Sequence, residues 1–242
     1  MEQTALITGA SKRIGKAITN YLAKGGWNVI VHYNSSNEEA VSLVEELSIK
    51  YPKQKFQVVH ANLADMAEVV ALIPKVIADF GNFDLLVNNA SVFDSGYLQE
   101  TSTELYDKQL DVNLKAPFFL IRDFANYCKR GSIINFVDTR ISSNKSNFAA
   151  YSISKKGLWD LTQMAALEFA PKIRVNAIAP GVTLAPDDKD DSYLEDLAKG
   201  IPMKRPSGLD PILNSIDYIL NNDYLTGQLL FADGGENLGQ NI

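Results

Sequence analysis

The chain has 242 residues, of which 46% are apolar and 21% are charged, a composition typical of a globular protein that excludes a disordered chain and a disulfide scaffold. The 23 basic and 29 acidic residues give a net charge of −6, which speaks against nucleic-acid partners, because such binding depends on Lys and Arg neutralising phosphates. The single cysteine, Cys128, and the lack of an apolar run near the ~18 residues of a membrane span predict a cytoplasmic protein with no membrane partner.

Short apolar runs alternate along the chain with segments of helical period. Runs that are apolar throughout are buried on both faces, which predicts a parallel sheet covered by helices. A closed eight-stranded barrel also has such strands, but its phosphate site usually lies in its last loops. Here a glycine-containing turn follows the first strand, so we predict an α/β protein with a single Rossmann-like, doubly wound parallel sheet over residues 1–242, with seven strands and helices on both faces. The expected strands are 4–8, 29–31, 56–59, 85–87, 133–137, 174–178 and 229–231, and the expected helices are 14–22, 38–50, 66–80, 105–128 and 151–169.

One segment has a different character. Four acidic residues, Asp187, Asp188, Asp190 and Asp191, cluster before a short helix, within a segment that we assign to a substrate loop at about 184–208. The cluster is explained either by a solvated loop or by a mobile lid over the site.

The turn at residues 8–15 joins the first strand to the first helix. Backbone N–H groups and the helix dipole attract an anion there. Lys12 and Arg13 stand at the helix start, where cations are disfavoured unless a neighbouring anion outweighs the dipole. The turn therefore predicts a bound phosphate, and the alternative is two solvated cations.

The second strand ends in polar residues without an acid. An NAD enzyme usually carries an acidic residue there to bind the ribose 2′-hydroxyl, but none occurs before Glu38. Hydroxyls and amides can hold a 2′-phosphate together with Lys12, or with Lys12 and Arg13, across the cleft, which predicts NADP(H). Ser35 or Ser36 could also cap the following helix. The segment consists of His32, Tyr33, Asn34, Ser35 and Ser36.

Several polar residues fall where strand ends and helices can converge on one cleft. Tyr151 and Lys155 are four residues apart and share a helix face. Asn89 follows the fourth strand, Asn113 lies inside a long helix, and Asp138 closes the fifth strand. On these residues, and on Pro180-Gly181 and residues 233–235, the chain resembles the short-chain dehydrogenases/reductases from end to end.

The resemblance implies a role for each of these residues. Tyr151 would be the central acid, and Lys155 would lower its pKa and hold the nicotinamide ribose. Asn113 would keep a water in a proton relay. The resemblance also implies a homotetramer that pairs through the helices at 105–128 and 151–169.

Three departures from the usual family pattern occur together: Arg13 replaces a glycine, Ser91 replaces the last glycine of Asn-Asn-Ala-Gly, and Asp138 replaces the catalytic serine. In this combination the chain resembles pteridine reductases and dihydromonapterin reductases. Phe93 stands where that subfamily places the ring that sandwiches a pterin against the nicotinamide, and Phe148 where it often has another aromatic. A further departure is Asn62, where the wider family usually has an Asp that contacts adenine.

The change from serine to Asp138 has a chemical rationale. A ketone reductase needs a hydroxyl to polarise a carbonyl oxygen, whereas reducing a C=N bond requires a proton on the ring nitrogen, which a carboxylic acid can deliver. As a carboxylate, Asp138 could instead accept hydrogen bonds from the pterin, and in a purely structural reading it caps the next turn. The mechanism implied by the resemblance is hydride transfer from NADPH to C6 of a 7,8-dihydropterin with protonation of N5.

These arguments define the candidate residues. The expected catalytic residues are Asp138, Tyr151, Lys155 and Asn113, the expected substrate contacts are Arg13, Phe93, Asp138, Phe148 and Tyr151, and we expect no metal site. The alternatives are a carbonyl reductase acting on a 3-oxoacyl thioester or another ketone, and an NADPH-sensing protein without turnover. The expected NADP(H) contacts are Gly9, Ser11, Lys12, Arg13, Ile14, Gly15, His32, Tyr33, Asn34, Ser35, Ser36, Asn62, Leu63, Asn89, Ala90, Ser91, Tyr151, Lys155, Pro180, Gly181, Val182 and Thr183.

Overall fold

A computed structural model describes residues 2–186 and 189–239. Within them, strands pair in parallel in the order β3-β2-β1-β4-β5-β6-β7. The chain reverses its direction of travel across the sheet between β1 and β4, as in a doubly wound fold. This confirms the predicted fold class and excludes the closed barrel. The strands are β1 Thr4–Ile7, β2 Asn28–Tyr33, β3 Phe56–His60, β4 Leu85–Asn88, β5 Gly131–Phe136, β6 Ile173–Pro180 and β7 Leu229–Ala232.

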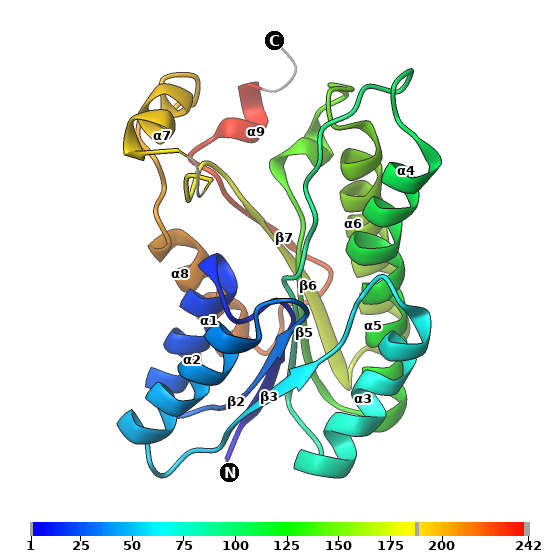
Figure 1. The fold of residues 1–242 in the computed structure, drawn as a ribbon, viewed down its shortest axis with the longest axis vertical. Coiled ribbons are helices and arrows are strands. Elements are labelled where there is room, and N and C mark those ends of the chain that lie inside the picture. Colours follow the sequence, from blue (N-terminus) through cyan, green and yellow to red (C-terminus); the bar gives the residue numbers. More distant parts are fainter. Residues whose placement is uncertain (1, 187–188, 240–242) are drawn as a thin grey trace.

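Helices cover the sheet on both faces (Figure 1). One core cluster joins the sheet to α1, α2 and α8, and a second joins it to α3, α5 and α6. The central strands β1 and β4 are buried at every residue, because both of their faces are covered. The helices are α1 Arg13–Lys24, α2 Asn37–Lys50, α3 Met66–Phe80, α4 Thr103–Leu110, α5 Ala116–Tyr127, α6 Ala149–Phe169, α7 Asp191–Ala198, α8 Asp210–Asn221 and α9 Glu236–Gly239.

The helix α8 was not expected, although its sequence carries a signal. Ile212, Ile216 and Ile219 follow one another at helical spacing and are all buried against the sheet. Pro211 stands in the first turn, where its missing N–H is tolerated.

The single helix expected at 105–128 is interrupted. A π-helical turn, Asp111–Lys115, separates α4 from α5, and Asn113 lies inside it. The N–H of Ala116 bonds to the carbonyl of Asp111, one residue further back than in an α-helix. Pro117, four residues after Asn113, has no N–H to donate to the Asn113 carbonyl. The local widening therefore occurs at a residue expected to act in the site.

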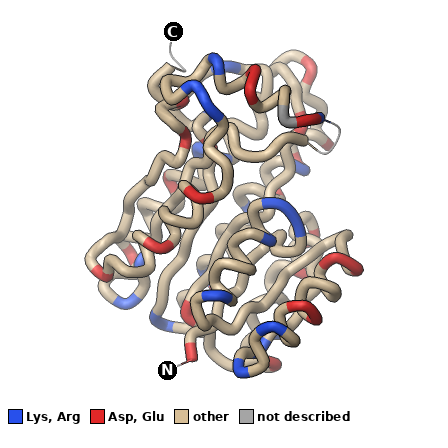
Figure 2. Tube along the Cα trace, turned by 90° about the vertical axis from the view of Figure 1, so that its left-hand side faces the viewer, with Lys and Arg blue, Asp and Glu red and all other residues tan. Residues whose placement is uncertain are grey.

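The segment expected as a substrate loop holds the short helix α7, at the same end of the molecule as α9 (Figures 1 and 2). Both lie beyond the carboxyl ends of the strands, the edge at which such sheets bind ligands. Two of the four acidic residues, Asp187 and Asp188, lie outside the described residues, and whether this segment closes as a lid stays a prediction.

Candidate active site

A continuous cleft runs along the carboxyl ends of the strands. It begins between β1 and β4, where the winding reverses, and continues toward α6 and α9. Three adjoining cavities of about 410, 360 and 420 Å³ make up the cleft. The first and second share Arg13, Asn89 and Ser91, and the second and third share Phe93, Asp138 and Val182. All the residues expected to hold cofactor or substrate line at least one cavity.

The floor of the first cavity is a tightly packed turn. Gly9 has a φ of +60°, and a Cβ there would lie 3.0 Å from Cα of Ala90. A Cβ on Gly15 would collide with the Gly9 carbonyl oxygen. Thr8 Oγ1 accepts the N–H groups of Asn89 and Ala90, and Asn89 Nδ2 donates to the carbonyls of Thr8 and Gly9. The backbone is thus held in a shape that lets a ligand approach closely.

The side chain of His32 holds this turn in place through a hydrogen bond with Gly9. It is buried, its Nδ1 accepts the Gly9 N–H over 3.1 Å, and its Nε2 lies 3.0 Å from the Ala61 carbonyl oxygen. This geometry requires a proton on Nε2 only, and burial lowers the pKa of His32 to about 4. His32 lines the cavity as expected, but both ring nitrogens serve the protein, so the structure gives it a supporting role.

Arg13 takes an unusual conformation and holds a distant segment. Its φ of +51° lies in the left-handed region that favours glycine. The guanidinium donates to the carbonyls of Ala185 and Leu184 over 2.9 and 3.3 Å. Arg13 therefore connects the phosphate turn to the start of the predicted substrate loop, a contact between residues far apart in the sequence.

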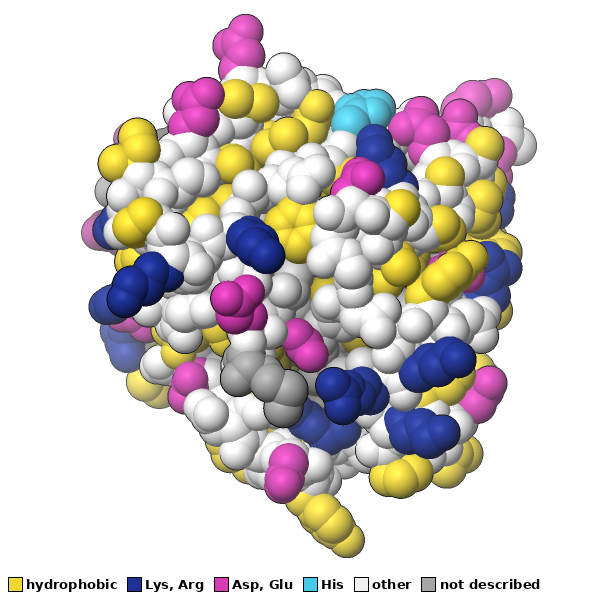
Figure 3. Space-filling model, turned by 90° about the horizontal axis from the view of Figure 1, so that it is seen from below, with side chains coloured by type: hydrophobic (Ala, Val, Ile, Leu, Met, Phe, Trp, Pro, Cys, Tyr) yellow, Lys and Arg dark blue, Asp and Glu magenta, His cyan; other side chains and the backbone are white. Residues whose placement is uncertain are grey.

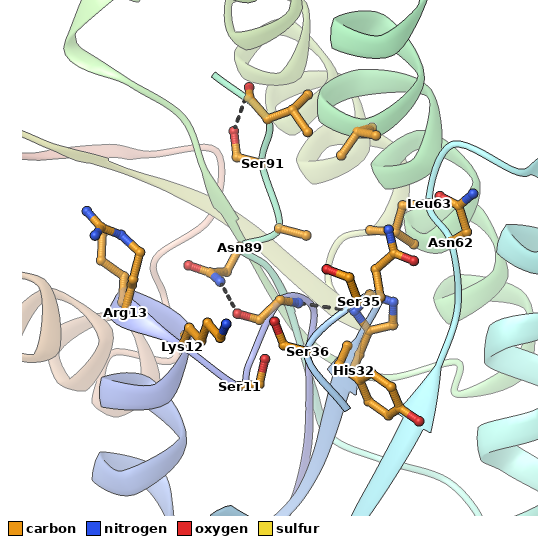
Figure 4. Close-up of a pocket in the computed structure, with 18 residues that line it drawn as sticks. Ser11, Lys12, Arg13, His32, Ser35, Ser36, Asn62, Leu63, Asn89 and Ser91 are labelled. Carbon is orange, nitrogen blue, oxygen red and sulfur yellow. Dashed lines mark hydrogen bonds between the residues drawn. The ribbon is translucent and has the colours of Figure 1, made fainter. Parts of the chain in front are cut away.

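The other end of the first cavity is lined by residues 33–36, Asn62 and Lys12 (Figure 4). Lys12 Nζ forms an ion pair with Glu39 Oε1 at 2.6 Å, which the sequence did not reveal. Ser36 occupies the N-cap position of α2, but its side chain makes no capping hydrogen bond, so the capping role is not observed for this residue. Asn62 Oδ1 accepts the N–H of Ala64. The lining contains hydroxyls, amides and a cation but no acid, a set that suits a phosphorylated ribose.

Tyr151 and Asp138 form the centre of the second cavity. The Tyr151 hydroxyl donates to Asp138 Oδ2 over 2.6 Å, and Asp138 Oδ1 accepts the Arg140 N–H over 2.8 Å. Asp138 therefore caps the 3₁₀ turn Thr139–Ser142 with one oxygen and faces Tyr151 with the other. The capping role is therefore observed, and the second oxygen faces Tyr151, as the catalytic prediction requires.

The expected lowering of the Tyr151 pKa is wrong for this structure. Burial, followed by Asp138, raises the pKa of Tyr151 well above its ordinary value. Lys155 lies on the same helix face, with Nζ 5.8 Å from the centre of the Tyr151 ring, but donates to the Phe136 carbonyl over 2.8 Å. Burial lowers the pKa of Lys155 to about 8, and Asp138 opposes that change. Tyr151 is therefore a protonated donor at neutral pH.

Asn113 is buried and uses its whole side chain to hold the loop after β4. Its Oδ1 accepts the Val92 N–H and the Ser91 hydroxyl, and its Nδ2 donates to the Val92 carbonyl over 2.9 Å and contacts Gln109 and Ser154. An amide oxygen has two lone pairs and an amide nitrogen two hydrogens, so this side chain has no capacity left. A relay through Asn113 would have to use its main-chain carbonyl, which Pro117 leaves without the usual helical donor.

An aromatic group forms the wall between the second and third cavities. The rings of Phe93 and Phe148 stack with centroids 4.2 Å apart and planes at 2°, and Phe93 meets the Tyr151 ring edge-on. No ring fits between two stacked aromatics at that distance, so a pterin has to use another face of Phe93 or displace Phe148. Phe93 is 55% exposed and so has surface to offer.

Sequence reasoning missed three charged residues of the third cavity, which are Arg140, Lys145 and Glu236. The Arg140 guanidinium lies 4.5 Å from the centre of the Phe148 ring and donates to Asn147. Glu236, on α9, has its pKa raised, first by burial and then by Asp138 and Asp233. Arg140 lies two residues after Asp138, and this short spacing could have indicated from the sequence that Arg140 belongs to the site. Glu236 gives no such signal, because only the fold brings α9 to this turn.

Other site types find no support in the described part of the chain. Its His, Cys, Asp and Glu residues form no group suited to a metal ion, and none of its helices has the length and apolarity to span a membrane. On the face seen in Figure 3, basic and acidic side chains are interspersed with apolar ones, without a uniformly basic surface.

Comparison with known proteins identifies the family. The sequence profile described as short chain dehydrogenase matches residues 3–193. The chain is a member of the short-chain dehydrogenase family. The chain is therefore an oxidoreductase of this family.

Relatives within the short-chain dehydrogenases differ in their substrates. The chain is 35% identical to 3-oxoacyl-[acyl-carrier-protein] reductase FabG of Staphylococcus aureus, over 97% of this chain and 98% of that protein. It is 32% identical to pteridine reductase 1 of Leishmania tarentolae, over 97% and 96%. The crystal structure of FolM alternative dihydrofolate reductase 1 from Brucella canis, complexed with NADP, has a TM-score of 0.90 and 33% identity, and covers 98% of this chain and 94% of that chain.

Proposed function

We propose that this protein uses NADPH to reduce the C=N bond of a 7,8-dihydropterin of the dihydromonapterin or dihydrobiopterin type. The observation that carries the proposal is the 2.6 Å hydrogen bond from Tyr151 to Asp138, beside the ring of Phe93. A proton-transferring carboxyl next to an aromatic ring suits a flat heterocycle whose nitrogen must be protonated. The similarity to pteridine reductase 1 and to FolM supports the same substrate class.

NADP(H) fits the first cavity. Gly9 and Gly15 give the close backbone approach that a pyrophosphate needs at the start of α1. Lys12, Ser35 and Ser36 line the ribose end, where no acid is present to repel a 2′-phosphate. Lys155, Val182 and Thr183 line the second cavity, where the nicotinamide would lie. The NADP bound to FolM supports this choice.

The residues of the site supply the proton. The Tyr151 hydroxyl carries the proton and donates it in a hydrogen bond to Asp138 Oδ2, so the two groups act as a pair. When bound, NADPH supplies a hydride to C6 of the substrate. The pair gives its proton to N5, so that the C=N bond becomes CH–NH, and solvent then reprotonates the pair. The buried Lys155 ammonium stabilises the negative charge that remains on the pair.

A 3-oxoacyl thioester reductase is the alternative, because FabG is the relative with 35% identity. Asp138 argues against it. Reduction of a ketone builds negative charge on the carbonyl oxygen, and a carboxylate in the place of the usual hydroxyl donor would repel that charge.

We also propose a cytoplasmic homotetramer that pairs through α5 and α6. Phe118 on α5 and Met164 and Leu167 on α6 are 49%, 65% and 86% exposed, which suits a covered surface. Ala165 and Ala166, in contrast, pack inside the core of the chain itself. A monomer in light scattering would contradict this assembly.

The decisive experiment follows NADPH oxidation with 7,8-dihydromonapterin, 7,8-dihydrobiopterin and an acetoacetyl thioester, for the wild type and Asp138→Ser. We expect pterin turnover in the wild type and its loss in the variant. Thioester turnover that survives the substitution, without activity on pterins, would identify a carbonyl reductase instead. A protein that binds NADPH but turns over none of the three would support a sensing role.

A further inference from the structure

Lys12 joins the phosphate turn to the next helix. It is the residue before α1, and Glu39 lies in the first turn of α2. Their charged atoms are 2.6 Å apart, and their side chains are 51% and 47% exposed. The hydrogen bond from Lys12 lowers the pKa of Glu39, which keeps this carboxylate ionised at neutral pH. Water reaches both groups, and their partners can therefore be exchanged.

The positive charge of the first cavity near residues 33–36 depends on Lys12. The two cations that line the first cavity are Lys12 and Arg13, and the lining holds no acid. Arg13 donates to the carbonyls of Leu184 and Ala185, and in Figure 4 its side chain extends away from Ser35 and Ser36. Lys12 is thus the cation that faces the ribose end, and it is paired with a carboxylate just outside the cavity.

We propose that Glu39 sets the preference of the site between phosphorylated and unphosphorylated dinucleotides, by competing with the 2′-phosphate for Lys12. A phosphate that binds Lys12 has to share or take over the ammonium that Glu39 now holds, and in either case the carboxylate stays close to the new anion. A cofactor with a free 2′-hydroxyl leaves the ion pair intact. Glu39 therefore weakens the binding of NADP(H) and leaves that of NAD(H) unchanged. This inference rests on the proposed function, in which NADP(H) occupies the first cavity.

The test measures dissociation constants of NADP⁺ and NAD⁺ by calorimetry for the wild type and Glu39→Gln. Because exposed ion pairs contribute at most about 1 kcal/mol, we expect NADP⁺ to bind about two- to fivefold more tightly to the variant at low salt. NAD⁺ should bind both proteins equally, and the gain should shrink at high salt because exposed charges are screened.

Glu38→Gln is the matched control, because it removes the same charge from the same helical turn at an exposed position. It should change NADP⁺ binding less than Glu39→Gln does. In a Lys12→Gln background, Glu39→Gln should lose most of its effect, since the competition has been removed.

Unchanged or weaker NADP⁺ binding in Glu39→Gln would overturn the inference, and so would weaker NAD⁺ binding, which would mean that the carboxylate contacts the ribose itself. If the wild type binds NADP⁺ but Glu39→Gln binds it no more tightly, the cofactor assignment stands and the proposed role of Glu39 is wrong. If the wild type binds neither NADP⁺ nor NADPH, the proposed function itself fails.

Discussion

The two ends of the cleft hold their polar groups differently. At the reacting end, around Tyr151, Asn113 and Lys155 are buried; the Asn113 side chain uses its whole bonding capacity within the protein, and Lys155 donates to the Phe136 carbonyl. At the ribose end, Lys12 and Glu39 are about half exposed and hold each other. A buried polar group that loses its partner is costly, whereas water compensates an exposed one. The buried polar groups of the reacting end are therefore held in one geometry, while those of the ribose end can exchange partners.

The largest expected effect is a loss of turnover without a loss of cofactor binding, caused by a substitution of Tyr151. Tyr151→Phe removes the hydroxyl that donates to Asp138 and keeps the ring that meets Phe93. We expect turnover to fall by about 10²–10⁴-fold, the usual contribution of a general acid, with NADPH affinity nearly unchanged. Stopped-flow turnover and cofactor titration measure the two quantities. Near-normal turnover would remove Tyr151 from the mechanism.

A smaller effect on activity is expected when the pH rises through the pKa of Lys155. Because burial lowers the pKa of Lys155 to about 8, its charged fraction falls about tenfold per unit above that pH. The kcat/KM should therefore decline through pH 8 to 9.5. Over the same range the unfolded chain, whose lysines titrate near 10.4, binds more protons than the folded one, so the contribution of Lys155 to stability improves as activity falls.

Two variants sharpen this pH prediction. Asp138→Asn removes the charge that raises the pKa of Lys155, so the residual activity should decline at a lower pH. The half-buried neighbour Lys156, which donates to Asn144, serves as the control, and Lys156→Gln should leave the profile in place. An activity that stays flat to pH 9.5 would show that the charge of Lys155 is not required.

The smallest effect is expected for substitutions of Arg13, which lines both the first and the second cavity. Arg13→Gly relieves a left-handed φ that costs a non-glycine residue about 1 kcal/mol, but it adds backbone freedom to the unfolded chain. We expect the free energy of unfolding to change by less than about 1 kcal/mol. The lost bonds to Leu184 and Ala185 should speed proteolysis of the segment after β6. Arg13→Lys keeps the charge and the strained φ, and unchanged proteolysis in both variants would contradict the role of Arg13 as a tether.

The sequence was sufficient to predict the parallel sheet and its strands, because apolar runs and their spacing are local signals. It also placed Asp138, Tyr151 and Lys155 correctly relative to strand ends and helix faces. It could not reveal the stack of Phe93 on Phe148 or the tether from Arg13 to Ala185, since both join distant segments. The direction of the Tyr151 pKa was also missed, because it depends on the degree of burial, which a residue spacing does not specify.

The contact of Arg13 with the segment after β6 has a thermodynamic consequence. The same side chain lines the first cavity and the second, so a ligand that draws the guanidinium away from Leu184 and Ala185 alters the entrance to the neighbouring cavity. Linkage is reciprocal: whatever factor the first ligand applies to the affinity of the second, the second applies to the first. The two halves of the cleft should therefore behave as coupled sites, and the affinity measured for either ligand alone should differ from its affinity in the ternary complex.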